Sequence, residues 1–507
     1  MSAAPAVETR PLLPLWAALI LAAGSGPVMD AAFPDLGVWP LAFPAVALVL
    51  VSLVGRRAGS AFLVGFVAGL AFYLVHIQWA SLFLGLLPMT ALSVLESLFW
   101  GLGAMAITLA YRWIPRAFPT ALGRAALLPL VVAALWMARE AWSSVWPYGG
   151  FSWGRLSMSQ SDSPLSSLFP WLGISGTTFV MVLLVALAIE VVRSPTLRRA
   201  TVAVAVATAV VALPAWPVMT DGSLRVAAVQ GNAKAGYFDG STARELLQAQ
   251  LDATVPLFGQ KGIDVVLWPE GTTYDDPLTD PYTGQVFDYV SEQVGAPLVG
   301  QGVTHRDGNY YNTAILWDAG RGALDLYDKK HPVPFGEYVP DRAFWRPFAP
   351  DLIDLIGREY TPGTTDNVFD LGGITVGINI CFDIVDDQIL TDSVREGAQV
   401  IFASSNNADF GHTDESAQQL AIARIRALEL GRSVVNISTV GLSAVIAPDG
   451  RIVDQLPWYS VGTMVQDVDL STAITPAVLL GRQLEWLISG FGVAALIIAA
   501  IGSRRRA

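Results

Sequence analysis

Three segments of this 507-residue chain each end in a side chain that could take part in covalent chemistry. The first is an apolar run over residues 264–268, which stops at a proline and presents Glu270. A carboxylate at the rim of an apolar strand is partly desolvated, which raises its pKa and makes it a better proton acceptor near neutral pH. The alternative interpretation is an ordinary solvated glutamate in a loop.

The second segment, residues 327–337, contains the adjacent lysines Lys329 and Lys330. Adjacent lysines usually form a solvated face of a protein, and that alternative remains open for this pair. The chain holds only two other lysines, however, and this pair lies between Tyr327 and a proline-rich stretch. We therefore consider a functional cation at this position.

The third segment, residues 374–380, is a strand-like run that leads directly into Cys381, the only cysteine of the chain. Buried cysteines commonly serve as small apolar residues. A thiol at the carboxyl end of a strand differs, because ligand crevices of open α/β sheets lie outside those ends. A thiol needs a nearby base or cation to act as a nucleophile, and the other two segments offer one of each.

These side chains need a folded domain to position them, and its signals begin near residue 220. Several short apolar runs are continuous in Val, Ile and Leu, as in strands covered on both faces. The predicted strands are 225–230, 264–268, 297–302, 312–317, 374–380, 400–403, 433–437 and 444–446. Helical patterns at 241–259, 284–294, 386–396 and 413–431 separate them, which predicts an α/β domain with helices packed on sheet layers.

The rest of the chain is too apolar for a soluble enzyme, since 53% of all residues are hydrophobic and 15% are charged. Eight runs approach the ~20 residues that a helix needs to cross a bilayer. They are 11–29, 38–55, 60–85, 87–111, 125–146, 173–192, 200–218 and 484–502. Because little positive charge precedes the first run and its cleavage signal is weak, we expect a membrane anchor there.

Arginines between these runs predict the topology, because cationic loops stay on the cytoplasmic side. With eight alternating spans, all five arginine groups fall on one side, which places both termini in the cytoplasm and residues 220–482 outside it. The domains are then 1–219, 220–482 and 483–507. Charges within the spans are few, chiefly Glu96 and the pair Arg139 and Glu140, which could form an interfacial ion pair or line a polar cavity.

Several classes of function are excluded or disfavoured by composition. A net charge of -12 argues against a nucleic-acid partner, which would require clustered Lys and Arg. One cysteine and four histidines rule out a disulfide framework and disfavour a thiolate metal site. The chain has no Gly-x-Ser-x-Gly elbow, and its Gly300-Gln301-Gly302 lacks a dinucleotide-binding context, so we expect no metal and no cofactor.

Taken together and in this order, the three segments resemble the Glu-Lys-Cys triad of the carbon-nitrogen hydrolase (nitrilase) superfamily over about 224–470. With the eight apolar runs, nearly the whole chain resembles the apolipoprotein N-acyltransferase family. Further matching stretches are 229–232, 333–340, 406–411 and 423–429, of which the Pro-Phe-Gly-Glu block ending at Glu337 is the most specific. The resemblance implies a membrane α-helical bundle of about eight helices plus an α/β nitrilase-like αββα sandwich.

The resemblance also implies roles for individual residues. Cys381 would be the nucleophile, Glu270 the general base and Lys329 the electrostatic partner. Lys329 is preferred to Lys330 because it satisfies the family's Tyr-x-Lys-x-His spacing with Tyr327 and His331. Glu337 matches a second glutamate that supports the triad in the family.

The chain departs from the family pattern at three positions. Phe382 and Asp383 follow the cysteine where the family often has Tyr and Glu, and Asp409 replaces a frequent aromatic residue. These departures concern the fine shape of the acyl pocket and leave the triad unchanged. Phe382 and Asp383 are therefore predicted as supporting or substrate-binding residues beside Glu337.

The activity implied by the resemblance is an acyl transfer in lipoprotein maturation. An acyl chain would pass from a membrane phospholipid, through a thioester on Cys381, to the N-terminal amine of a diacylglyceryl-cysteine apolipoprotein. The enzyme would lie in the bacterial cytoplasmic membrane as a multi-pass protein with its catalytic domain on the extracytoplasmic face. Two alternatives stay open: a membrane-tethered amidase or nitrilase that uses water, and a noncatalytic membrane scaffold with a degenerate nitrilase domain.

Overall fold

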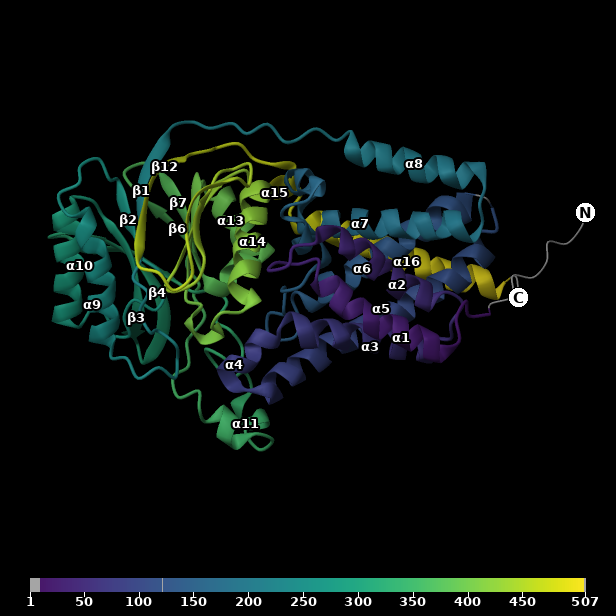
Figure 1. Ribbon diagram of the computed structural model, residues 1–507, viewed down its shortest axis with the longest axis horizontal. Helices are drawn as coiled ribbons and strands as arrows, with labels where there is room; N and C mark the ends of the chain where they lie inside the picture. The colour runs from purple at the N-terminus through teal and green to yellow at the C-terminus, as the bar shows by residue number, and fades with distance from the viewer. Residues whose placement is uncertain (1–9, 121, 506–507) are drawn as a thin grey trace, which may run out of the picture. The chain divides into compact units, whose positions relative to one another are not determined.

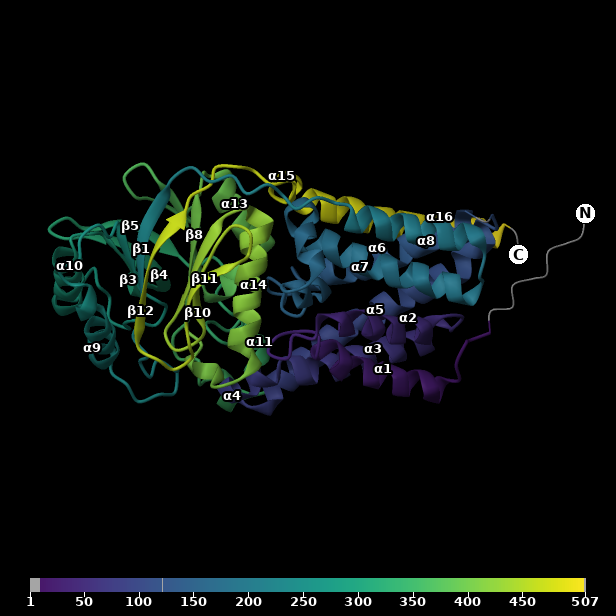
Figure 2. The ribbon, with the colours of Figure 1, turned by 45° about the horizontal axis from the view of Figure 1, so that its top comes forward.

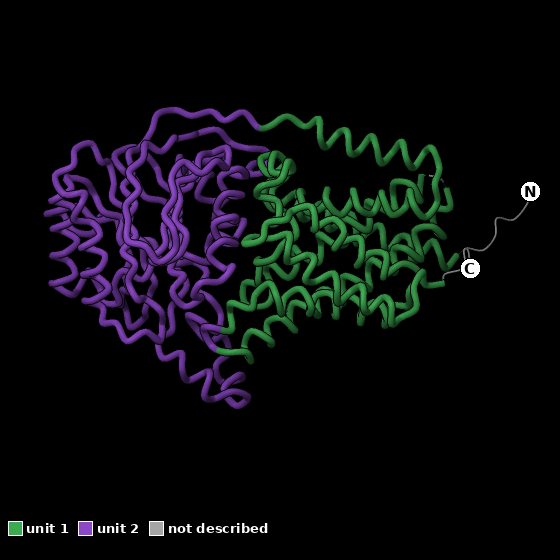
Figure 3. Tube along the Cα trace, in the orientation of Figure 1, with its two compact units in different colours: residues 1–81, 85–215, 480–507 green, residues 82–84, 216–479 purple. Residues whose placement is uncertain are grey.

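The computed structural model describes residues 10–120 and 122–505, which divide into two compact units (Figure 3). The first unit takes the residues up to Ser81, residues 85–215, and the residues from Leu480 onward. The second unit takes residues 82–84 and 216–479. Arg506, one of the arginines used for the predicted topology, lies outside the described residues.

The first unit consists of helices (Figure 1). Five helical segments are long and apolar enough to cross a membrane: Ala58–His76 (α3), Leu86–Ala117 (α5), Gly123–Ser143 (a π-helical turn and α6), Pro164–Arg193 (ending in α7) and Arg482–Arg504 (α16). The helices α1 (Leu15–Asp30) and α2 (Ala42–Leu53) are apolar but shorter, and α8 spans Leu197–Val211. Helix length thus supports five of the predicted spans, and the count of eight stays a prediction.

Small residues let helices of this unit approach closely. A Cβ atom on Gly65 of α3 would lie 2.4 Å from the Cβ of Ala104 and 2.6 Å from the carbonyl oxygen of Trp100, both on α5. A Cβ on Gly26 of α1 would lie 2.4 Å from the backbone of Ala71 on α3. Glycine is therefore required at both contacts, as is common where membrane helices pack.

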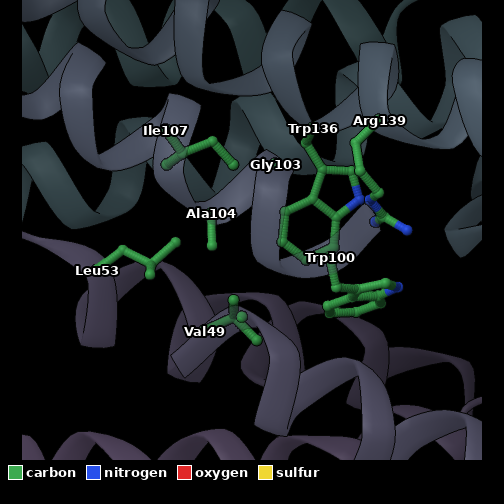
Figure 4. A pocket seen from close by; sticks show the side chains of 9 residues that line it. Val49, Leu53, Trp100, Gly103, Ala104, Ile107, Trp136 and Arg139 are labelled. Atoms are coloured by element: carbon green, nitrogen blue, oxygen red, sulfur yellow. The ribbon is translucent and has the colours of Figure 1, made fainter. Parts of the chain in front are cut away.

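The charged pair of the fifth predicted span is buried inside the helical unit. Arg139 and Glu140 of α6 are 7% and 3% exposed, and their side chains lie 3.3 Å apart. Figure 4 shows that Arg139 also lines a small pocket together with Trp100 and Trp136. Arg139 and Glu140 therefore form a buried ion pair, and Arg139 alone of the two lines the cavity, whose other walls are mainly apolar.

The second unit contains two six-stranded sheets. The order in the first sheet is β12-β1-β2-β3-β4-β5, and the order in the second is β11-β10-β9-β8-β7-β6. Strands β1 to β3 are mutually parallel, as are β7 to β9, and the remaining pairs are antiparallel. The strand bounds are β1 Ser223–Gln230, β2 Val265–Leu267, β3 Leu298–Arg306, β4 Asn309–Asp318, β5 Gly322–Asp328, β6 Val368–Asp370, β7 Thr375–Ile380, β8 Val400–Ser405, β9 Ser433–Ser438, β10 Ser443–Ile446, β11 Ile452–Leu456 and β12 Gly462–Asp469.

Helices cover the outer face of each sheet, as Figures 1 and 2 show. On β1, Val226 and Ala228 belong to the core between the sheets, whereas Ala227 and Val229 belong to a second core with residues of α9 (Ala243–Thr254) and α10 (Pro281–Val294). The helices α13 (Asp387–Arg395) and α14 (Asp414–Leu430) pack beside the second sheet. Because the strands are apolar on both faces, the layers stack as the predicted αββα sandwich, which confirms the fold class.

All eight predicted strands and four predicted helices of this unit have counterparts in the structure. The four strands that the sequence pattern missed are β5, β6, β11 and β12, which are the edge strands of the two sheets. Exposed and partly buried residues alternate in β11, and β5 has two adjacent exposed residues. Edge strands have one neighbour instead of two, so they lack the long apolar runs on which the prediction relied.

Two short helical turns in the second unit also have no predicted counterpart. They are α11 (Arg342–Trp345) and α12 (Pro350–Ile353), each of four residues. Such segments are too short to show helical periodicity in a sequence.

Candidate active site

Each of the three predicted catalytic residues lies at the C-terminal end of a strand, either directly after it or a few residues further on. Glu270 lies three residues beyond β2, Lys329 directly follows β5, and Cys381 directly follows β7. Strands β2 and β5 belong to the first sheet and β7 to the second, so the candidate site draws on both sheets of the sandwich.

Cys381 occupies a strained turn at the end of a buried strand. Its φ angle is +50°, in the left-handed region that residues other than glycine rarely adopt. The residue is half-buried and begins a 3₁₀ helix, Cys381–Val385. Such strain persists only where the surroundings enforce it, and it is common at functional sites.

Glu270 is 8% exposed and is held at several points. The side-chain amide of Asn312 donates to its Oε1 at 2.7 Å, and the backbone N–H of Asn406 donates to its Oε2 at 2.9 Å. The hydroxyl of Thr439 donates to its main-chain carbonyl. The neighbouring thiol of Cys381 acts to lower the pKa of this carboxyl group.

Lys329 is 1% exposed, and its ammonium group lies between two carboxylates. Its Nζ is 2.8 Å from Oε2 of Glu337 and 3.5 Å from Oε1 of Glu270. Its main chain is fixed as well, because its N–H donates to the carbonyl of Asn312 at 2.9 Å. The structure therefore brings Lys329 next to Glu270.

Lys330 takes a different environment from its neighbour. It is half-buried, and its backbone N–H donates to the hydroxyl of Tyr327 at 3.4 Å. Its charge acts on Glu396, which lies just after α13, and among the described residues no ion pair joins Lys330 to Glu270 or Glu337.

Glu337 lies in the turn that follows Lys329 and completes the anionic side of the cluster. Its Oε2 accepts the N–H of Val333 at 2.6 Å, and its Oε1 accepts the amide of Asn312 at 3.0 Å. Asn312 thus bridges Glu270 and Glu337, and its geometry fixes both carboxylates relative to Lys329.

The charges of this cluster shift the pKa of each member. Burial acts to lower the pKa of Lys329, but Glu337 and Glu270 overcome it, so the pKa is raised well above its ordinary value and the group is an ammonium ion. Burial raises the pKa of Glu270, although Lys329 acts against that rise. Since Glu337 is the nearer partner of the lysine, Glu270 keeps the capacity to accept a proton.

The thiol is protonated in the resting site. Burial and the neighbouring carboxylate of Glu270 raise the pKa of Cys381 well above its ordinary value, and the opposing effect of Lys329 is smaller. The cation therefore does not produce a resting thiolate. The cysteine depends on transfer of its proton to a base, and Glu270 is the carboxylate that acts most strongly on the pKa of the thiol.

Of the two residues after the cysteine, Asp383 is fully buried and Phe382 is half-buried. Asp383 accepts hydrogen bonds from the hydroxyl of Tyr327 at 2.8 Å and from the N–H groups of Ile380 and His331 at 3.2 Å each. Burial raises its pKa, with Lys329 acting in the opposite direction. Asp383 therefore ties the end of β7 to the end of β5.

Two residues of the site were given no role in the sequence analysis: Asn312, and Asn406, which was noted only as the first residue of the matching stretch 406–411. Asn312 is the first residue of a predicted strand. A polar amide at the boundary of an apolar run is the signal that could have marked it as a site residue. Asp409, which differs from the family pattern, accepts a hydrogen bond from the backbone N–H of Tyr237 at 2.7 Å. Within the described residues, no group of three or more His, Cys, Asp or Glu could hold a metal ion.

Two parts of the chain match known protein families. Residues 225–475 match the carbon-nitrogen hydrolase family, and residues 25–187 match the apolipoprotein N-acyltransferase N-terminal domain. The chain thus combines a carbon-nitrogen hydrolase domain with the helical domain of one group of acyltransferases.

Whole-chain relatives then define the particular family. The chain is 33% identical to the apolipoprotein N-acyltransferase of Mycolicibacterium smegmatis, over 96% of this chain and 86% of the relative. It is 28% identical to that of Pseudomonas paraeruginosa, over 97% of each. The chain belongs to the apolipoprotein N-acyltransferase family and is an acyltransferase, which confirms the resemblance found in the sequence.

The chain is also similar to solved structures. An amidase from Nesterenkonia sp. is 19% identical, with a TM-score of 0.38, and the match covers 50% of this chain and 94% of the amidase.

Proposed function

We propose that this protein transfers an acyl chain from a membrane phospholipid to the N-terminal amine of diacylglyceryl-cysteine apolipoproteins. The observation that carries the proposal is the cluster of Cys381, Glu270 and Lys329 in a chain that also holds membrane-length helices. Glu337 supports the lysine, and Asp383 fixes the turn that carries the thiol. The half-buried Phe382, beside the nucleophile, is assigned to substrate contact.

The first half-reaction forms an acyl-enzyme. Glu270 accepts the proton of the Cys381 thiol, and the sulfur attacks the ester carbonyl of the phospholipid. The negative charge that develops on the carbonyl oxygen is stabilised by the ammonium group of Lys329. The ester C–O bond then breaks, Glu270 returns the proton to the leaving alkoxide, and a lysophospholipid departs from a thioester.

The second half-reaction transfers the acyl chain to nitrogen. The neutral amine of the lipoprotein attacks the thioester carbonyl, a C–N bond forms, and the C–S bond breaks. Glu270 accepts a proton from the attacking nitrogen and passes it to the departing sulfur, which restores the thiol of Cys381. Because a covalent intermediate separates the two substrates, two bulky lipids can use one site in turn, with ping-pong kinetics.

The proposal includes a location and a division into domains. Residues 1–219 and 483–507 would form the membrane part, and residues 220–482 would form the catalytic domain on the extracytoplasmic face of the bacterial cytoplasmic membrane. The arginines between the apolar runs support cytoplasmic termini. This location places the cysteine on the side of the membrane where lipoproteins carry their lipid.

Mass spectrometry of the purified protein, incubated with phospholipid, tests the proposal. We expect one acyl adduct on Cys381, and we expect it to disappear with formation of an amide when a diacylglyceryl lipopeptide is added. Cys381→Ala is the control and should carry no adduct. Discharge of the adduct as free fatty acid in the presence of the lipopeptide would instead support a hydrolase, and no adduct at all would contradict the proposal.

A further inference from the structure

A second buried glutamate lies beside the candidate site and has no part in the mechanism above. Glu415, in the first turn of α14, is 2% exposed. Both of its carboxyl oxygens face the side-chain nitrogen of Asn407, at 2.8 and 3.1 Å. A buried carboxyl group held by one amide requires an explanation.

Asn407 is the centre of the hydrogen-bond network that contains Glu415. Its Nδ2 donates to Glu415 and also to Oε1 of Gln419, at 2.7 Å. Its Oδ1 accepts from the hydroxyls of Ser438 and Ser405. Both N–H donors and both lone pairs of the amide are thus in use, so the network defines one orientation of the side chain.

Close packing holds the same orientation. A Cβ atom on Gly441 would lie 2.3 Å from Oδ1 of Asn407 and 2.6 Å from Oγ of Ser416. Because no side chain fits at position 441, the backbone there lies directly against the amide of Asn407.

The network reaches Glu270 through two adjacent residues. Asn406 precedes Asn407, and its backbone N–H donates to Oε2 of Glu270 at 2.9 Å. Thr439 follows Ser438, and its hydroxyl donates to the main-chain carbonyl of Glu270. Since Asn407 binds Ser438 directly, the network joins the two segments that hold Glu270 in place.

The two buried glutamates differ in their charged partners. Glu270 has the ammonium group of Lys329 at 3.5 Å, whereas no Lys or Arg is paired with Glu415 among the described residues. Burial raises the pKa of Glu415 to about 8, opposed by its hydrogen bond with Asn407 and reinforced by the charge of Glu270. At neutral pH the group therefore keeps its proton.

We propose that Glu415, as an uncharged carboxylic acid, is a positioning residue that holds Asn407 and thereby keeps the Asn406 N–H on Glu270. The inference rests on the proposed role of Glu270 as the base for Cys381. Ionisation of Glu415 would add a negative charge that acts on Glu270, on Cys381 and on Tyr459. Such a charge disfavours the thiolate, so activation of the cysteine should fail at alkaline pH.

The sole cysteine gives a direct measurement that does not require acyl transfer. We would follow alkylation of Cys381 by iodoacetamide in the full-length protein from about pH 6 to about pH 10, a range that spans the ordinary cysteine pKa. In the native protein the rate should stop rising once Glu415 ionises. Glu415→Gln keeps the shape and the uncharged state, so it should match the native rate at pH 7 and exceed it about tenfold at the alkaline end.

A truncation and a matched control complete the experiment. Glu415→Ala leaves Asn407 without its partner and should lower the rate at pH 7 by about tenfold or more, since small displacements of a catalytic group are costly. Asp288→Asn removes a carboxylate from α10, where Asp288 binds Trp317, and should leave the whole pH profile unchanged.

The outcomes separate this inference from the proposed function. A Glu415→Gln profile that coincides with the native one would overturn the inference, as would a folded Glu415→Ala protein with native reactivity. Parallel incubation with phospholipid reports on the proposed function alone, because failure of the native protein to form an acyl adduct leaves the alkylation profiles measurable.

Discussion

Each of the two units contains a buried cation that is paired with glutamate. The two clusters differ in what the cation and its glutamate partners contact. In the carbon-nitrogen hydrolase domain, Lys329 lies between Glu337 and Glu270, and the carboxylate of Glu270 acts on the pKa of the Cys381 thiol. In the helical unit, the guanidinium of Arg139 lies 4.3 Å from the ring centre of Trp100 and 5.1 Å from that of Trp136.

In the helical unit, the glutamate partner Glu140 makes only structural contacts with the described residues. Oε1 of Glu140 accepts hydrogen bonds from the indole of Trp136 at 3.0 Å and from the N–H of Leu156 at 3.3 Å, besides its contact with Arg139. These contacts fix α6 and its neighbours, and none of them involves a nucleophile. A buried ion pair thus supports chemistry only where a reactive group lies within its reach.

The largest effect is expected at the nucleophile itself. Cys381→Ala should abolish acyl transfer, because no other thiol exists in the chain, while the thermal unfolding temperature stays close to that of the native protein. Transfer of acyl chains to a lipopeptide is the measurement. Normal turnover by the purified variant would refute the assignment of Cys381.

Removal of the cation in the catalytic cluster should be nearly as severe. Lys329→Ala should lower the rate of acyl-enzyme formation by about 10²–10³-fold, the usual cost of losing one donor to a developing oxyanion. Lys330→Ala is the matched control and should be mild, because Lys330 lies outside the cluster. Equal losses in the two variants would mean that the wrong lysine has been assigned.

A smaller loss is expected where a neutral residue only orients the charges. Asn312→Ala removes the amide that bridges Glu270 and Glu337, and should lower kcat/KM by about 10–100-fold through misplacement of the carboxylates. An unchanged kcat/KM in the folded variant would contradict this role. It would show that Lys329 alone positions the carboxylates of Glu270 and Glu337.

The pH dependence sharpens the role assigned to Glu270. Burial raises the pKa of this carboxyl group, and only its ionised form accepts a proton. Acyl-enzyme formation should therefore be present above the raised pKa and lost as the pH falls through it, at a pH above the ordinary glutamate value of about 4.3. The rate of adduct formation on Cys381, measured in acidic buffers, gives this part of the pH profile. A midpoint at the ordinary pKa of a glutamate would contradict the assignment of Glu270.

The smallest effect on chemistry is expected in the helical unit. Arg139→Met leaves Glu140 buried without its cation, which should lower the free energy of unfolding by about 3–5 kcal/mol, whereas the protein that stays folded should acylate Cys381 normally. Adding Glu140→Gln should recover part of the stability. Loss of acylation in a variant with native thermal stability would break the contrast between the two clusters.

The sequence anticipated those parts of the fold that depend on neighbouring residues. The central strands were predictable because each is a continuous apolar run, and the four helices of the sandwich were predictable from their periodicity. The edge strands β5, β6, β11 and β12 were missed, because a strand with one neighbour carries less of that signal.

By itself, the sequence determined the order of the motifs, the apolar runs and the identities of Glu270, Lys329 and Cys381 as candidates, because these follow from local patterns and spacing. Only the tertiary structure brought Asn312 between two carboxylates. It also paired Asn407 with Glu415 and placed the N–H of the adjacent Asn406 on Glu270. These contacts join residues of separate strands, loops and helices, and their energies depend on burial and on distances that arise only when both sheets have packed.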